Sequence, residues 1–126
     1  MILGLGLDLV EVARIRRLRE ARGERFLDRV YTPGEREACA GRREPDEGLA
    51  ARFAAKEAAM KALGTGWTEG VAWRDFEVVS EGGPPRLQLS GVAARRAAEL
   101  GVGRVHLTLS HDAGVAGAVV VFEGEP

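Results

Sequence analysis

Hydrophobic residues alternate with small or polar ones along the first ten positions, MILGLGLDLV. This period of two is typical of a β-strand, whose successive side chains point to opposite faces. Leucines occupy positions 3, 5, 7 and 9 and therefore share one face. Asp8 lies on the other face with Gly4 and Gly6, which leave room beside it. The pattern predicts an N-terminal strand with one leucine face and one face that carries a carboxylate.

Helical spacing follows this strand. Ile15, Leu18 and Phe26 predict a helix from about Val10 to Val30, a segment dense in arginine. Its arginines are Arg14, Arg16, Arg17, Arg19, Arg22, Arg25 and Arg29. A second, short helix should begin at Thr32, because Pro33 and Glu35 complete the pattern of an N-cap, a proline at the first position and a capping box.

Residues 41–48, GRREPDEG, are expected to form a polar loop. The helix RFAAKEAAMKALGTG follows at 52–66 and ends at Gly64, a helix C-cap. Beyond it the pattern predicts strands at 73–79 and 86–89 around a turn at 82–85, then a helix at 91–100. Strands at 104–110 and 114–122 should pair as a hairpin through HDAG at 111–114. This order predicts an α+β fold in which a small antiparallel sheet packs with helices, as a single domain over 1–126.

The helix at 52–66 has no wide polar face. At 100° per residue its charges fall in two narrow seams, Arg52 with Lys56 and Glu57 with Lys61. Large apolar side chains line one side and alanines cover most of the other. Charges in such seams need partners or a ligand.

Composition restricts the function further. The chain has 126 residues, is 45% hydrophobic and 29% charged, and has a net charge of −1, which argues against general nucleic-acid binding. Arginine outnumbers lysine sixteen to two, and both lysines lie in the helix at 52–66. A single cysteine, Cys39, fits a reducing compartment and has no neighbouring metal ligands, so we interpret it as inert. Neither a signal peptide nor a membrane-spanning run is evident, and we expect a cytoplasmic protein.

Each charged motif also has an ordinary structural explanation. Asp8 and Glu11 fit a capping box, which on its own is the favoured interpretation. Glu57 and Lys61 fit a routine helix ion pair at i and i+4. Arg52 and Lys56 fit no such explanation, because two cations at this spacing repel one another unless an anion lies between them or solvent screens them. They indicate a weak anion site.

The tripeptide Ser110-His111-Asp112 is not a catalytic triad, because adjacent residues of an extended chain point to opposite sides. A histidine such as His111, beside a turn, is more often structural than functional. The sequence also lacks a Walker loop, a GxGxxG, an HExxH and a clustered cysteine–histidine set.

Taken together and in order, the motifs resemble those of one family. GLGLDLVEVARI at 4–15, FLDRVYTPGE at 26–35, ARFAAKEAAMKALGTG at 51–66, WRDFEV at 73–78 and LSHD at 109–112 are similar to holo-acyl-carrier-protein synthase, a phosphopantetheinyl transferase. The resemblance covers nearly the whole chain. One departure is visible at 83–85, where Gly-Pro-Pro stands in place of the family's common Gly-Lys-Pro or Gly-Arg-Pro. A basic residue that could contact substrate in relatives is replaced here by Pro84.

The resemblance implies a phosphopantetheinyl-transferase-like fold and transfer of 4'-phosphopantetheine from coenzyme A to a serine of an apo-acyl carrier protein. It implies that Asp8 and Glu57 bind Mg²⁺ and act in catalysis with Lys61, which stabilises phosphate charge. The implied cofactor-binding residues are Arg52, Lys56, Lys61, Gly64, Gly66 and His111, with Arg42 and Arg43 as weaker candidates. Arg14 is the implied contact to the carrier protein, and a homotrimer with sites at subunit boundaries is expected.

Two alternatives stay open. A non-catalytic module that binds nucleotides or acidic proteins would use the same cations without needing Asp8, Glu57 or Mg²⁺. A transferase of the same fold could instead serve a polyketide or peptide carrier.

Overall fold

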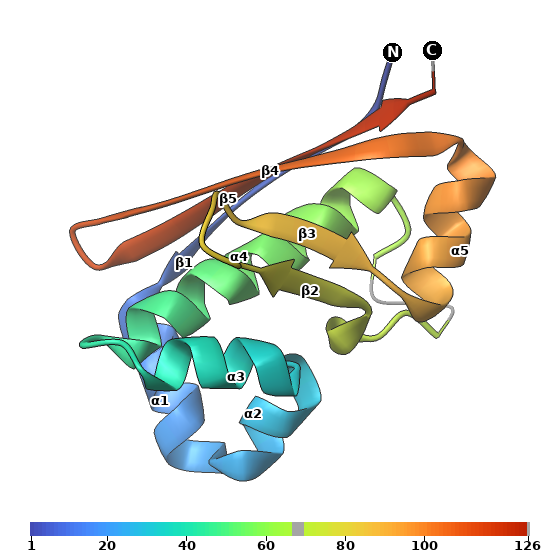
Figure 1. The fold of residues 1–126 in the computed structure, drawn as a ribbon. Coiled ribbons are helices and arrows are strands. Elements are labelled where there is room, and N and C mark those ends of the chain that lie inside the picture. The colour runs from blue at the N-terminus through green and yellow to red at the C-terminus, as the bar shows by residue number, and fades with distance from the viewer. Residues whose placement is uncertain (67–69, 126) are drawn as a thin grey trace.

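The computed structural model describes residues 1–66 and 70–125 and has an α+β architecture (Figure 1). A three-stranded antiparallel sheet has the order β1 (Ile2–Glu11), β5 (Val115–Gly124), β4 (Val102–Asp112). The long helix α4 (Pro45–Leu63) packs along one face of this sheet. A second, two-stranded sheet pairs β2 (Phe76–Val79) with β3 (Arg86–Leu89). The predicted fold class is confirmed.

The glycines of β1 allow helix α4 to approach the strand backbone. A Cβ atom built on Gly4 would overlap the carbonyl oxygen of Ala62, and one built on Gly6 would overlap that of Ala58. Only glycine fits such a contact between two backbones. The opposite face of β1 presents exposed leucines at positions 3, 5, 7 and 9. The predicted alternation is therefore correct, and the glycine face is the one that points inward.

The arginine-rich segment forms two helices instead of the single predicted one. Helix α1 (Val12–Arg22) and helix α2 (Glu24–Val30) are separated by Gly23, which has a φ of 56°. The predicted Asp8–Glu11 capping box is wrong, because Asp8 lies within β1 and Glu11, the N-cap residue of α1, makes no side-chain capping hydrogen bond. The capping box at Thr32 is confirmed at the start of helix α3 (Pro33–Ala40).

Several boundaries differ from the prediction. Helix α4 begins at Pro45, inside the predicted loop, because proline is well tolerated in the first turn of a helix. It ends at Gly64, which is left-handed at φ 80° as predicted. Residues Trp73–Asp75 form the short 3₁₀ helix η1 rather than the start of a strand. The helix at 91–100 is confirmed as α5 (Gly91–Leu100).

The predicted C-terminal hairpin is present, with a tighter turn than expected. Strands β4 and β5 run up to Asp112 and from Val115, so only Ala113 and Gly114 form the turn. Both have positive φ, at 51° and 79°, as a two-residue type I′ turn requires. His111 is consequently a strand residue, level with Ala116 of β5 and Val10 of β1.

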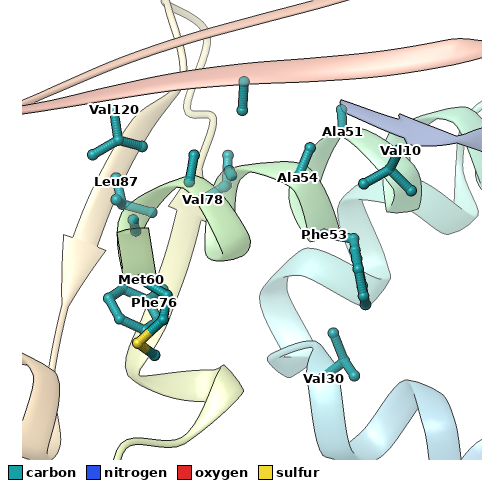
Figure 2. Close-up of a cluster of buried hydrophobic side chains, with 14 of the residues drawn as sticks. Val10, Val30, Ala51, Phe53, Ala54, Met60, Phe76, Val78, Leu87 and Val120 are labelled. Atoms are coloured by element: carbon teal, nitrogen blue, oxygen red, sulfur yellow. The ribbon is translucent and has the colours of Figure 1, made fainter. Parts of the chain in front are cut away.

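The hydrophobic core surrounds α4. Figure 2 shows Val10, Phe53 and Val30 toward one end of the helix, and a second group that includes Met60 and Phe76 toward the other. Cys39 is buried in this core, and burial raises the pKa of its thiol. Within residues 1–66 and 70–125 we find no helix with the length and hydrophobicity needed to cross a bilayer.

Candidate active site

Asp8 and Lys61 meet where β1 lies against the last turn of α4. The Lys61 ammonium donates to Asp8 Oδ1 at 3.1 Å and to the Leu7 carbonyl oxygen at 3.0 Å. The close approach at Gly6 holds the strand near the helix, so that a short side chain such as that of aspartate reaches the lysine. The structure thus brings together two of the predicted catalytic residues, which are 53 positions apart in sequence.

Glu57 lies one turn before Lys61 on α4 and lines the same cavity. This cavity has a volume of about 360 Å³ and is bordered by Glu57, Met60, Lys61, Gly64 and Gly66. Lys61 therefore lines this cavity together with Glu57 and the two glycines, and at the same time binds the Asp8 carboxylate. Five of the residues expected to act on substrate or cofactor are gathered in this region, and we name it the α4 C-terminal site.

The donor set of this site fits a magnesium ion. Mg²⁺ binds through oxygen ligands and usually keeps several waters, with only one or two carboxylates supplied by the protein. Asp8 and Glu57 supply such carboxylates next to an open cavity. No group of three or more potential metal-ligating side chains occurs among the residues that the structure describes, so the site does not resemble an all-protein cage.

Lys56 does not belong to this site. Its side chain is completely buried, and its ammonium donates to Glu35 Oε1 at 2.7 Å, to the Trp73 carbonyl oxygen at 3.3 Å and to the Phe76 carbonyl oxygen. Burial lowers the pKa of Lys56, while the adjacent Glu35 carboxylate opposes that shift. The charge of Lys56 is thus matched within the protein, and we withdraw it from the cofactor-binding residues.

Arg52, its predicted partner, is also buried, with 2% of its surface exposed. Its Nη1 donates to the Gly48 carbonyl oxygen at 3.2 Å, one turn earlier in α4. Its Nε has no hydrogen-bond partner among the described residues. Unlike Lys56, this cation keeps an unsatisfied donor, which costs free energy when it is buried away from water.

His111 lies at the other end of α4. Its Nε2 is 3.5 Å from Oε1 of Glu47, in the first turn of that helix. Glu47 precedes Glu57 by ten residues, which corresponds to roughly 15 Å along the helix axis. One chain therefore does not bring His111 to the α4 C-terminal site. Arg42 and Arg43 lie before the same helix start and are exposed.

Arg14 lies beside a second concave feature. Its guanidinium carbon is 5.4 Å from the centre of the Phe53 ring, a cation–π contact, and the Phe53 ring stacks on Trp73 at 4.8 Å. Phe53 and Trp73 also line a groove of about 780 Å³, which we name the arginine-lined groove. Its other lining residues are Leu18, Ala21, Arg22, Arg25, Phe26, Arg29 and Val30.

A buried carboxylate binds two of the arginines of α1, and the arginines that line the groove on α1 and α2 are not among them. Asp46, near the start of α4, accepts hydrogen bonds from Arg19 Nε at 2.7 Å, Arg19 Nη2 at 2.9 Å and Arg16 Nε at 3.1 Å. The hydrogen bonds from Arg19 are the main cause of a lowered pKa for Asp46. Arg16 and Arg19 thus fasten α1 to α4, whereas Arg22, Arg25 and Arg29 border the groove. No local pattern indicates this role of Asp46, because its partners lie 27 and 30 residues away in the chain.

Comparison with known proteins identifies the family of this chain. The model of the family described as the 4'-phosphopantetheinyl transferase superfamily matches residues 4–119. The chain belongs to this superfamily. Among curated members, it is 60% identical over 127 residues to the holo-[acyl-carrier-protein] synthase of Anaeromyxobacter dehalogenans, and the match covers 98% of both chains. It is 51% identical over 124 residues to that of Solibacter usitatus, with 98% and 99% covered.

Solved structures of phosphopantetheinyl transferases share the fold. The holo-[acyl-carrier-protein] synthase of Neisseria meningitidis has a TM-score of 0.88 and 36% identity, and the match covers 98% of this chain and 99% of that one. The Helicobacter pylori synthase, solved in complex with coenzyme A, has a TM-score of 0.83 and 30% identity, with 94% and 99% covered.

Proposed function

We propose that the protein transfers 4'-phosphopantetheine from coenzyme A to a serine of an apo-acyl carrier protein in fatty acid biosynthesis, releasing adenosine 3',5'-bisphosphate. Membership of the superfamily and the activity named for its relatives support this proposal. So does the coenzyme A complex of the Helicobacter pylori protein. The observation in this chain that carries it is the Asp8–Lys61 pair beside the cavity lined by Glu57.

In this reaction the serine hydroxyl of the carrier gives up its proton to a base, and its oxygen forms a bond to the phosphorus that bears the pantetheine arm. The bond from that phosphorus to the bridging oxygen breaks, and the leaving phosphate departs with the nucleotide. Asp8 and Glu57 would hold Mg²⁺, which when bound neutralises charge on the phosphate oxygens. Lys61 would donate to those oxygens while it fixes the orientation of Asp8. Because the nucleophile comes with the carrier, the chain needs no activated serine of its own.

The remaining phosphates of coenzyme A need further donors. Gly64 and Gly66 border the cavity, and their φ values of 80° and 65° favour glycine. Because glycine has no side chain, a phosphate could approach the backbone at both positions. His111 is exposed, and we propose it as a phosphate ligand, with Arg42 and Arg43 as weaker ones. The Arg52 Nε lacks a partner but is buried, so a phosphate cannot reach it in this fold and we withdraw Arg52 as well. The end of α4 does not attract anions by itself, because a helix C-terminus carries partial negative charge.

A homotrimer would unite residues that one chain keeps apart. His111 lies near the start of α4 and Glu57 near its end, so a neighbouring subunit could supply the histidine to the α4 C-terminal site. The exposed leucines of β1 form an apolar sheet face of the kind that marks a protein interface. Both features support an assembly with sites at subunit boundaries, and we propose that it is a trimer and that the protein is cytoplasmic.

The carrier protein would dock on the arginine-lined groove. Arg14 lies over Phe53 at this groove, and Arg22, Arg25 and Arg29 border it. An acidic helix with an apolar stripe would find both charge and shape complementarity there. Pro84 lies in the exposed turn between β2 and β3 and is not among the residues that line the groove.

The test is to incubate the protein with coenzyme A, Mg²⁺ and an apo-acyl carrier protein and to weigh the carrier by mass spectrometry. A mass increase that corresponds to one phosphopantetheine is expected, and a polyketide or peptide carrier assayed in parallel shows which acceptor is preferred. An unchanged mass, together with binding of coenzyme A, would instead identify a non-catalytic nucleotide-binding module.

Glu57→Gln tests the proposed metal ligand. The substitution should reduce turnover by at least ~10³-fold, about 4 kcal/mol of lost transition-state stabilisation, with little change in unfolding. Asp8→Asn should give the same loss, and the double variant should be scarcely worse than either, because both remove one shared ion. A folded Glu57→Gln protein with near-normal, Mg²⁺-dependent turnover would exclude Glu57 as a ligand.

A further inference from the structure

The most deeply buried ion pair of the described chain joins Glu35 to Lys56. On α4, Lys56 lies between Phe53, which lines the arginine-lined groove, and Glu57, which lines the α4 C-terminal site. Glu35 has 1% of its surface exposed and Lys56 has none. Glu35 Oε1 accepts from Lys56 and from the Thr32 backbone N–H at 3.0 Å, while Oε2 accepts from the Val78 N–H at 2.9 Å. The pair therefore connects the start of α3, the middle of α4 and strand β2.

A buried ion pair is not needed to stabilise a fold of this size. The desolvation of two charges often exceeds their attraction, and well-packed hydrophobic residues of similar volume can be equally stabilising. An apolar pair, however, could not bind the carbonyl groups that Lys56 binds. Those carbonyls belong to Trp73, the first residue of η1, and to Phe76, the first residue of β2, which follows η1 directly. The ammonium thus fixes the path of one particular segment.

That segment carries a wall of the arginine-lined groove. Helix α4 holds Trp73 at two points, because Lys56 binds its carbonyl oxygen and the Phe53 ring stacks on its indole at 4.8 Å and 28°. Phe53 and Lys56 are three residues apart and so lie on neighbouring positions of the same helix face. The next residue after Lys56 is Glu57, which lines the α4 C-terminal site.

We propose that the Glu35–Lys56 pair is a positioning unit that fixes Trp73 against Phe53 and so sets the shape of the arginine-lined groove relative to Glu57. The inference rests on the proposed function, since it assigns the groove to the carrier protein. Neither residue touches substrate. Their effect is transmitted through the Trp73 main chain, and it should therefore appear in carrier recognition rather than in coenzyme A recognition.

Three variants test the proposal. Lys56→Met removes the cation and leaves the Glu35 carboxylate buried without a counter-ion, so it should lower Tm strongly. Lys56→Met with Glu35→Gln removes both charges and should recover much of that loss. Glu35→Gln alone leaves Lys56 its two carbonyl acceptors and provides a folded variant if the others fail to fold. Glu24→Gln is the matched control, because it breaks the Glu24–Arg36 ion pair, which is exposed and distant in sequence from Trp73.

Kinetics are measured with each substrate in turn, at a temperature well below the lowest Tm. The double variant should raise the KM for carrier protein by about tenfold or more while the KM for coenzyme A changes less than about twofold, because a displaced groove misplaces only the carrier. Glu35→Gln should raise the carrier KM by about threefold, and Glu24→Gln should not change it. Native carrier KM in both pair variants would show that the pair has only a folding role and would overturn the proposal.

A second readout does not depend on the reaction. In a Trp67→Phe background Trp73 is the only tryptophan. Acrylamide should quench its fluorescence about twofold more efficiently in the double variant than in wild type, because the ring is no longer held against Phe53. Unchanged quenching in a folded double variant would also overturn the proposal. If the wild-type protein transfers no phosphopantetheine, the proposed function fails, while this measurement still decides whether the pair positions Trp73.

Discussion

Gly6→Ala should disturb both the fold and the candidate active site, because the added methyl group has no space. A Cβ atom built on Gly6 would lie 2.7 Å from the Ala58 carbonyl carbon and 3.1 Å from the Ala62 nitrogen, and all of these neighbours are α4 backbone. Carbon atoms in contact normally lie about 3.5–4.0 Å apart, and the Ala58 carbonyl oxygen is closer still, so β1 must move away from α4 by at least about 1 Å. The predicted cost of such overpacking is about 1–3 kcal/mol of unfolding free energy.

The same displacement separates Asp8 from Lys61. Their hydrogen bond is 3.1 Å long, and an additional 1 Å or so takes it beyond the usual limit for such a bond. A misplacement of this size can reduce the rate of an enzyme by about 10²-fold. We therefore expect turnover in the mass-spectrometric transfer assay to fall by about two orders of magnitude even at temperatures where the variant is fully folded.

Urea unfolding and the transfer assay together check this reasoning. Gly41→Ala is the matched control, because Gly41 has a φ of −81° and an added Cβ would meet nothing within 4 Å. It should leave both stability and turnover at wild-type values. Wild-type stability and turnover in Gly6→Ala would refute the view that the strand and helix backbones set the site geometry.

Three further predictions concern Arg14, Asp46 and the assembly of subunits. Arg14→Glu should raise the KM for carrier protein in a salt-dependent manner and leave that for coenzyme A nearly unchanged, as steady-state kinetics can show; an equal loss for both substrates would contradict the placement of the carrier. The Arg19 hydrogen bonds hold the pKa of Asp46 below its ordinary value of about 3.9, so their contribution to stability is present above about pH 4 and is lost as pH falls through the lower, folded pKa. Asp46→Asn should therefore cost about 1 kcal/mol in urea unfolding at pH 7, and the difference from wild type should shrink as pH falls below about 4. A difference that stays constant with pH would be evidence against this role. Leu7→Glu should convert a sedimenting trimer into monomers with little activity, whereas fully active wild-type monomers would exclude a shared site.

Local patterns in the sequence were sufficient to predict most elements. Alternation identified β1, and the Thr32 and Gly64 end signals identified the start of α3 and the end of α4. Gly23 was overlooked because the hydrophobic spacing continues on both sides of it, while its left-handed conformation breaks the helix. The site residues Asp8 and Lys61 could be named only through the resemblance to a family, because the motifs alone fitted a cap and a helix ion pair.

Contacts between distant segments were beyond prediction from one sequence. Two cations at i and i+4 indicated an anion site at Arg52 and Lys56, under the assumption that both faced solvent or ligand. In the fold Lys56 instead meets Glu35, 21 residues earlier, and only Arg52 retains an unsatisfied donor. Glu35 itself was assigned to the capping box, which uses the same Oε1 atom that Lys56 binds. A residue can thus satisfy a local pattern and still make its most consequential contact elsewhere.

In the proposed trimer, the leucine face of β1 would make the stability of this protein depend on its concentration. Leu5, Leu7 and Leu9 each have more than half of their surface exposed in a single chain, at 65%, 57% and 66%. If copies of the chain cover this face, association and folding are linked by mass action, and the unfolding free energy rises with the logarithm of protein concentration. At low copy number the leucines would meet water or another apolar surface, so in the proposed trimer the level of expression would help to determine how much of the chain is folded.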